Sequence, residues 1–309
     1  MVDNKFPPNM GQQGMPMQPP VQQPVGNPLA RHLRQPKIYI RLPSGGNYWP
    51  QGSLEKTENG EFPVYAMTAK DEITFKTPDA LLNGQATVDV IQSCMPNIKN
   101  AWHTPSIDMD AILVAIRRAS FGDEMTMTAK VPGTDIMKDF NVNLSGIFDN
   151  LMSATYVDSF QIPGFKVQII PLSYKTITEG TIKAFEEQRI FSIVNNDDLA
   201  DADKLLQFQK SFQKLTELNV NTLINSVIAI QPDGDEVAVE NPTHLKEFLE
   251  GCDAETFNHI KNHIEQERGK FQQQPMKVSA TEEEIEAGAP KTYDLPITFD
   301  QGTFFAKGS

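Results

Sequence analysis

The sequence predicts an α+β protein, in which an N-terminal mixed region of strands, helices and hairpins precedes a helical region and a C-terminal strand pair. Three observations lead to this class. Short runs of alternating apolar and polar residues fill the chain between residues 37 and 170. Apolar residues recur every three or four positions after residue 173, and alternation returns at residues 293–299.

The composition divides the chain into four expected segments. Residues 1–35 interleave proline with glutamine, and such a segment buries too little apolar surface to offset its ordering entropy. We therefore expect a disordered arm. An alternative is a short motif that folds on a partner through Phe6, Met10, Met15 and Met17. The other segments are an α+β domain with a central hairpin at 36–172, a helical region at 173–275, and an acidic linker with a β segment at 276–309.

In the first domain, alternation predicts strands at 37–42, 62–67 and 72–75. Thr77-Pro78 is typical of the start of a helical turn, and a helix is expected at 87–94. The clearest helix is predicted at 108–121, because apolar residues recur there at spacings of three and four and Gly122 can end it. The residues that define its buried face are Met109, Ile112, Leu113, Ile116 and Ala119.

A hairpin is predicted next, with strands at 125–129 and 140–144 joined across Pro132-Gly133-Thr134-Asp135. A short helix at 146–152 leads to strands at 157–162 and 165–170. Further helices are expected at 176–194, 205–215 and 223–228, after Asn241-Pro242, and after Asp253. The chain then returns to strand and ends in Phe304-Phe305.

Charge and composition exclude several classes of function. The net charge of −13 argues against a nucleic-acid partner, which requires a basic surface. The longest apolar run, at 111–116, is too short to span a membrane, and the N-terminus lacks the apolar core of a signal peptide. Two distant cysteines, Cys94 and Cys252, cannot form a disulfide framework or a four-cysteine zinc site. We expect a protein without membrane, cofactor or metal.

The sequence contains no recognisable catalytic motif. His259, His263 and Glu267 have a spacing that could bind a divalent metal, but Phe257, Ile260 and Ile264 define the buried side of that helix. The three polar residues are therefore expected on a solvated face. Ser44-Gly45-Gly46 lacks the Lys-Ser/Thr of a phosphate-binding loop and predicts a turn, and Glu282-Glu283-Glu284 is interpreted as a solvated charge run. We expect a protein that is not an enzyme.

Three aromatic residues are the candidate binding residues. Tyr48, Trp49 and Trp102 fall in predicted loops beside prolines, outside the periodic core stripes. Loop aromatics of this kind often dominate the energy of protein interfaces, so they are predicted to contact a partner protein. The alternative is that they fold back and seal the N-terminal core.

Several stretches resemble one known family. They are residues 38–46, 77–84, a block from Val90 to Met125 that contains Trp102, Asp108, Asp110 and Ile116-Arg117, and the closing residues 295–300 with Phe304-Phe305. In combination they resemble the baseplate hub proteins of T4-like contractile-tailed bacteriophages. The resemblance covers most of residues 36–309 and leaves out the arm.

The resemblance implies a subunit of the baseplate hub, or a factor that helps the hub to assemble, with other hub and tail proteins as partners. Such a protein is found in the host cytoplasm during assembly, and then in the tail if it stays in the virion. An assembly chaperone that never enters the virion is the alternative. Many family members carry paired cysteines in the central hairpin and near the C-terminus, whereas this chain has residues 132–135 and 286–289 there. In those members the paired cysteines look like zinc ribbons, and because this chain departs from the family by lacking them, we do not expect the family's zinc site here.

Overall fold

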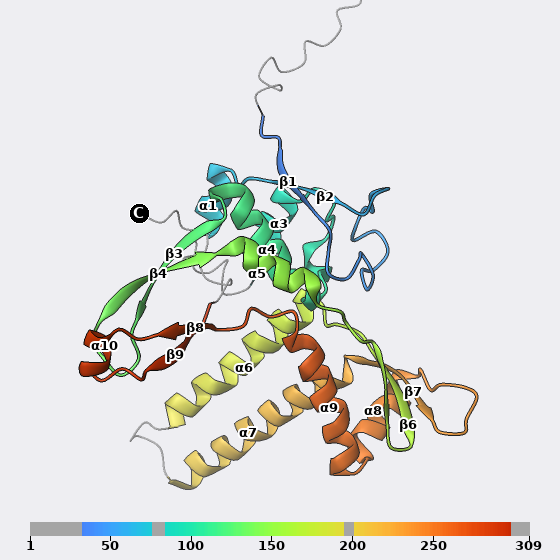
Figure 1. The fold of residues 1–309 in the computed structure, drawn as a ribbon. Helices are drawn as coiled ribbons and strands as arrows, with labels where there is room; N and C mark the ends of the chain where they lie inside the picture. Colours follow the sequence, from blue (N-terminus) through green and yellow to red (C-terminus); the bar gives the residue numbers. More distant parts are fainter. Residues whose placement is uncertain (1–32, 76–83, 195–200, 298–309) are drawn as a thin grey trace, which may run out of the picture. The chain divides into compact units, whose positions relative to one another are not determined.

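The computed structural model describes residues 33–75, 84–194 and 201–297, which form helices and several small antiparallel sheets (Figure 1). This arrangement confirms the predicted α+β class. Other predictions lie outside the described residues: almost all of the arm, the turn at Thr77-Pro78, and Phe304-Phe305.

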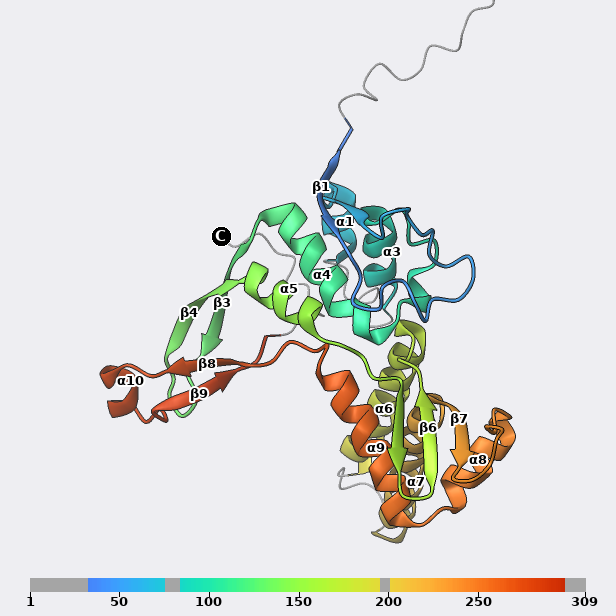
Figure 2. The ribbon, with the colours of Figure 1, turned by 45° about the vertical axis from the view of Figure 1, so that its right-hand side comes forward.

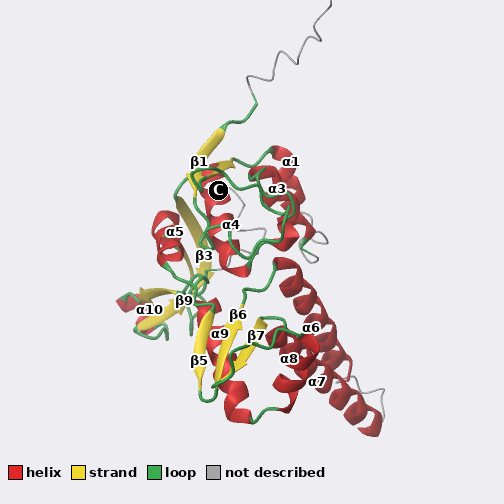
Figure 3. Ribbon diagram, turned by 90° about the vertical axis from the view of Figure 1, so that its right-hand side faces the viewer, coloured by secondary structure: helices red, strands yellow, loops and turns green. Residues whose placement is uncertain are grey.

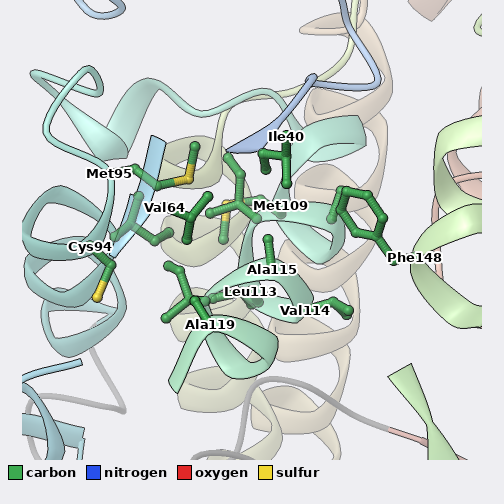
Figure 4. Close-up of a cluster of buried hydrophobic side chains, with 14 of the residues drawn as sticks. Ile40, Val64, Cys94, Met95, Met109, Leu113, Val114, Ala115, Ala119 and Phe148 are labelled. Atoms are coloured by element: carbon green, nitrogen blue, oxygen red, sulfur yellow. The ribbon is translucent and has the colours of Figure 1, made fainter. Parts of the chain in front are cut away.

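The first core surrounds the long helix α4 (Ser106–Phe121), which was predicted from its apolar spacing. Ile112 and Ile116 are fully buried. Side chains from several other elements gather around α4, among them Ile40, Val64 and Phe148 (Figure 4). A helix that is apolar on nearly every side is a core helix. The elements of this core are β1 (Pro36–Ile40), β2 (Phe62–Tyr65), α1 (Ala69–Phe75), α3 (Gln85–Cys94) and α5 (Leu144–Ser153).

Helix α1 replaces the strand that was predicted at residues 72–75, so that prediction is wrong. Thr68 and Asp71 cap the helix reciprocally: Asp71 N donates to Thr68 Oγ1 at 3.2 Å, and Thr68 N donates to Asp71 Oδ2 at 2.7 Å. This is a capping box with aspartate in place of glutamate. The cap fixes a helical turn, which buries Phe75 and leaves Ile73 exposed.

Two hairpins face each other around a small separate core. Strands β3 (Glu124–Lys130) and β4 (Met137–Asn143) form the predicted central hairpin. Strands β8 (Met276–Ser279) and β9 (Thr292–Leu295) form the second pair, which lies beside the first (Figure 2). Val131 and Phe140 from the first hairpin pack with residues of the second. The buried residues from the second hairpin are Ala289, Tyr293 and Leu295.

The acidic run at residues 282–284 is only partly solvated, which corrects the sequence interpretation. It begins the short helix α10 (Glu282–Glu286), and Thr281 and Glu284 form a capping box at its start. Glu284 is buried, and Lys138 Nζ from β4 donates to its Oε1 at 2.7 Å. The hydrogen bond from Lys138 is the main reason why the pKa of Glu284 lies below its usual value. The carboxylate thus joins the two hairpins.

A second core lies under the antiparallel sheet β5–β6–β7 (Figure 3). Its strands are β5 (Ser159–Ile162), β6 (Phe165–Ile169) and β7 (Val227–Pro232), and α8 (Pro242–Gly251) and α9 (Ala254–Gly269) supply Leu245, Leu249 and Ile260. The helix predicted at 223–228 is correct only in part: Leu223 and Ile224 form the end of a helix, and strand β7 begins at Val227. The spacing of Leu223, Ile224, Val227 and Ile228 fits a helix, but the β-branched residues from Val227 onward pair with β6 instead.

Between β6 and β7 the chain forms a pair of long helices. α6 (Tyr174–Val194) and α7 (Asp201–Ile224) run side by side (Figures 1 and 3). Lys214 Nζ of α7 donates to Glu187 Oε1 of α6 at 2.9 Å. The start of α6 packs against the short 3₁₀ helix η2 (Ala101–His103). This contact connects the helical pair to the first core.

Candidate functional site

The loop that carries Tyr48 and Trp49 follows β1 directly. Gly45 and Gly46 have φ values of 62° and 78°, a region that glycine adopts without steric cost. Gly45 N donates to Leu42 O at 2.8 Å, which closes the turn predicted from Ser44-Gly45-Gly46. Tyr48 also has a positive φ of 63°, which is uncommon for a residue with a side chain. The contacts of this loop therefore hold it in a strained conformation.

Asp108 holds the loop to the first core. Its carboxylate is fully buried and accepts hydrogen bonds from Ser44 N at 2.8 Å, Ser44 Oγ at 2.6 Å and Trp49 Nε1 at 2.8 Å. Burial raises the pKa of Asp108 to about 6, although the three donors oppose that shift. A buried carboxylate with three donors inside the same chain serves to fix a loop.

Tyr48 makes its own contacts within the chain. Its hydroxyl donates to Asp158 Oδ2 at 2.9 Å, and its ring meets Tyr156 edge-on at a centroid distance of 5.6 Å. Partial burial, and secondly the hydrogen bond to Asp158, raise the pKa of Tyr48 to about 12. Tyr48 thus links the loop after β1 to the segment that precedes β5.

Trp102 lies in η2 and stacks on Tyr174, the first residue of α6, with ring centroids 5.6 Å apart. The Asn100 side chain accepts a hydrogen bond from Trp102 N and caps η2. Beside the indole is a groove of about 390 Å³, whose other walls come from η2 and α6. The lining residues on α6 are Lys175, Thr178, Glu179 and Ile182.

Two interpretations of these aromatics were left open by the sequence. Trp49 and Trp102 are half-buried and pack against the first core, which supports the interpretation that they seal it. Tyr48 is half-buried as well. Contact with a partner protein is a separate property, and the remaining exposed surface of Trp102 opens onto the groove. Partner binding by Tyr48, Trp49 and Trp102 therefore stays a proposal.

Of the three polar residues of α9, His259 is exposed as predicted, whereas His263 and Glu267 do not lie on a solvated face, which corrects the sequence interpretation for these two. Glu267 is buried, and it accepts hydrogen bonds from Val157 N at 2.9 Å and Lys270 Nζ at 2.6 Å. His263 stacks on Phe160 with ring centroids 3.6 Å apart. The chain around β5 covers this side of the helix. Within the described part of the chain, no group of three or more His, Cys, Asp or Glu residues could hold a metal ion.

Among the residues that the structure describes, Ser53 and His103 form a serine–histidine pair. Ser53 Oγ lies 2.7 Å from His103 Nδ1, but Ser53 is almost completely buried. Its carbonyl oxygen also accepts from Lys99 N and Asn100 N, so Ser53 fixes a turn. Among residues 33–75, 84–194 and 201–297, no carboxylate hydrogen-bonds to His103. The pair lacks the third group that orients a catalytic histidine.

The most exposed apolar side chains of α6 and α7 were missed by the sequence analysis. Phe185 of α6 and Leu205 and Phe212 of α7 are all exposed. Leu205 and Phe212 belong to a periodic stripe, and periodicity alone predicts burial for such residues. No described helix is long and apolar enough to cross a bilayer.

Comparison with known proteins identifies the family. Residues 50–286 match the family model described as "T4 bacteriophage base plate protein". Neither curated proteins nor solved structures give a match. The matched region contains Asp108, Trp102 and the α6–α7 pair, and it covers more than half of the chain. The chain therefore belongs to the T4 bacteriophage base plate protein family.

Proposed function

We propose that this baseplate protein is a subunit or assembly factor of the baseplate hub, and that it works by binding other tail proteins and not by catalysis. The observation that carries the proposal is an apolar surface in a chain of the baseplate family: Trp102 and Ile182 line the groove, and the exposed Phe185 follows Ile182 on α6. We call this surface the Trp102 surface. Its partner would present apolar side chains to the groove beside the indole.

The geometry of the Trp102 surface supports a binding role. The stack on Tyr174 fixes the indole, so Trp102 would lose little side-chain entropy when a partner docks against it. Phe185 follows Ile182 by three residues, which places both on one side of α6, and 60% of Phe185 is exposed. Rigid aromatics with exposed apolar neighbours are typical centres of protein interfaces.

Tyr48 and Trp49 belong to the same proposal with a smaller role. Trp49 Nε1 and the Tyr48 hydroxyl already bind Asp108 and Asp158, so only the remaining faces of these rings are available to a partner. Substitution of Trp49 also removes a donor from a buried carboxylate. A double Trp49→Ala, Trp102→Ala variant would therefore test stability together with binding.

Phe185→Glu is the sharper test, because the side chain is exposed and its replacement should leave the fold intact. We expect a loss of about tenfold or more in affinity for hub and tail proteins, measured by co-purification and titration, and a lower yield of complete tails. Val237→Glu is the matched control, since Val237 is also an exposed apolar residue, at 77%, in the loop after β7. Equal tail yields for the two variants would contradict the Trp102 surface.

Mass spectrometry of purified virions separates the two forms of the proposal. A hub subunit should be present in stoichiometric amounts relative to other baseplate proteins. Its absence from virions, together with tail loss when the gene is deleted, would indicate an assembly factor or cytoplasmic chaperone. Normal tails without the protein would contradict both.

A further inference from the structure

Strand β1 has an open edge. It pairs with β2 on one side, and the two strands form a separate two-stranded sheet. Bonded and non-bonded residue pairs alternate along an antiparallel ladder, and Tyr39 lies opposite Pro63, which has no N–H to donate. The pair Tyr39–Pro63 is therefore a non-bonded one, and the N–H and C=O groups of Tyr39 point away from β2. Among the described residues, none bonds to these two groups.

The open edge is cationic in an acidic chain. Lys37, Tyr39 and Arg41 are exposed and alternate with less exposed residues, and Tyr39 is 62% exposed. No Asp or Glu occurs between residues 4 and 54, although the chain has a net charge of −13. The ion pair of Arg41 with Glu61 is a 3.5 Å contact between two exposed side chains, so it adds little stability and can be exchanged.

These charges select the strand that can add to β1. An exposed strand edge can pair with an extended segment of another chain, and like charges directly opposite each other disfavour such a pairing. Lys37 and Arg41 therefore oppose the pairing of two β1 strands with each other. They favour an extended segment with two acidic residues four positions apart, which places one carboxylate opposite each cation.

The loop after β7 contains such a segment. Residues 233–240 include four acidic residues and no Lys or Arg. Glu236 and Glu240 are exposed and stand four positions apart, as the two cations of the open edge do. Val237 between them is 77% exposed. The spacing and the sign of the charges thus match those of the β1 edge.

This segment also has an open backbone edge. Val239 and Ile230 of β7 exchange two backbone hydrogen bonds, at 2.8 and 3.0 Å. The alternation of an antiparallel ladder then directs the N–H and C=O groups of Ala238 and Glu240 away from β7. Within the described part of the chain, no backbone group bonds to them. A strand that adds here extends the sheet β5–β6–β7.

We propose that copies of this chain associate head to tail, with β1 of one copy pairing antiparallel with residues 236–240 of the next. In this register the two cations lie opposite the two glutamates, and both open edges gain hydrogen-bond partners. The facing pairs are Tyr39–Ala238, Lys37–Glu240 and Arg41–Glu236. Glu236 lies in a bend of the single chain, so the segment straightens there on association.

The two contacting surfaces differ, so the interface is heterologous. Each copy presents a β1 edge to one neighbour and residues 236–240 to another, and such contacts build a closed ring or an open filament. This inference does not depend on the proposed hub function or on the Trp102 surface.

Sedimentation of the full chain tests the proposal. Between about 1 and about 100 µM the wild-type protein should associate increasingly, and added salt should reverse this, because the facing charges are exposed. The edge variant, Lys37→Glu with Arg41→Glu, places like charges opposite each other. The loop variant, Glu236→Lys with Glu240→Lys, does the same. Each should weaken self-association by about tenfold or more.

Mixing the two variants gives the sharper measurement. The loop variant keeps a wild-type β1 and the edge variant keeps wild-type residues 236–240, so an equimolar mixture should associate although neither variant does so alone. A chain with all four substitutions should also associate like the wild type. Circular dichroism of each variant establishes that it is folded.

Two controls separate the facing pairs from net charge. Lys166→Glu with Lys291→Glu changes the charge as the edge variant does, at exposed positions outside the interface, and should associate like the wild type. Val237 lies on the other face of the extended segment, so Val237→Glu leaves the facing pairs intact and should associate as well. A loss in the lysine control equal to that of the edge variant would overturn the proposal.

Two further outcomes would overturn it. A wild-type protein that stays monomeric at about 100 µM shows that its copies do not pair in this way. A mixture of the edge and loop variants that stays monomeric, while the wild type associates, assigns self-association to another surface and the β1 edge to an acidic strand of a different protein.

Discussion

Asp108 is the residue at which burial and charge conflict most directly. Its carboxylate is fully buried, yet it accepts three hydrogen bonds. The donors are the backbone N–H and the hydroxyl of Ser44 and the indole N–H of Trp49. Desolvation prevails over these donors, because the pKa lies near 6 and not at the usual 3.8. The interaction therefore positions the loop at a cost in stability around neutral pH.

This conflict predicts a pH dependence with a definite sign. Between about pH 4 and pH 6 the folded protein keeps the Asp108 proton that the unfolded chain loses, so the contribution of Asp108 to stability falls as the pH rises. Over this pH range the contribution of Asp108 to the free energy of unfolding falls by about 3 kcal/mol in total. The free energy of unfolding of Asp108→Asn, measured with urea, should improve relative to wild type by this amount between about pH 4 and pH 7.

Asp149→Asn is the control for this measurement, because Asp149 is exposed on α5. Its stability should stay parallel to that of the wild type over the same range. A difference between wild type and Asp108→Asn that is independent of pH would show that the Asp108 carboxyl does not titrate in this window.

The environments of the three candidate aromatics could be predicted only in part. Their positions in loops and beside prolines are visible in the sequence. Their partners are not, because Asp108 is 59 residues from Trp49 and Asp158 is 110 residues from Tyr48. No local pattern connects residues that far apart, so the contacts that these aromatics make within the chain could not be predicted from the sequence.

At the scale of elements, two glycines determine how closely the hairpins approach. A Cβ atom on Gly133 would lie 2.6 Å from Gly288 O, and both glycines have positive φ. Gly133 lies in the turn of the β3–β4 hairpin, and Gly288 lies between α10 and β9. These are the two stretches where the family resemblance implies cysteines in other members. Here backbone contact and the Lys138–Glu284 bond join them.

Gly133→Ala should consequently destabilise the protein beyond the usual backbone cost. Gly164→Ala is the matched control, since Gly164 has a similar φ of 86° in the β5–β6 turn with nothing within 4 Å of the added Cβ. We expect the free energy of unfolding, measured by chemical denaturation, to fall by about 1 kcal/mol for Gly164→Ala and by about 2 kcal/mol or more for Gly133→Ala. Equal losses would mean that the hairpins separate without cost.

Elements with one strong periodic signal were predictable, and elements with two competing signals were not. The apolar spacing from Met109 to Ala119 has no alternative explanation, and α4 forms as expected. At residues 72–75 short alternation competed with the Thr68–Asp71 cap, and the cap determines the structure. At β7 a helical spacing competed with β-branched residues, and the available edge of β6 decides the outcome.

At the scale of the whole molecule, the arm and the body should be separable. The composition of residues 1–35 predicts no contribution to a core. Deletion of these residues should leave the thermal midpoint within about 3 °C of the full chain. Scanning calorimetry of the two proteins measures this directly. A fall much larger than that would mean that the arm packs on the body.

The position of α6 and α7 between two neighbouring strands has an evolutionary consequence. Ile170 N donates to Ser226 O at 2.8 Å, so the chain leaves the sheet and returns to it at adjacent positions. Adjacent antiparallel strands need a connection of only a few residues. Doubling the length of a flexible connection costs only about 0.6 kcal/mol in loop-closure entropy. Related phages can therefore lengthen or shorten this excursion by whole helical turns, provided that both helices change together. Insertions and deletions within the family should concentrate between residues 185 and 212, while the spacing from Trp102 to Tyr174 stays fixed.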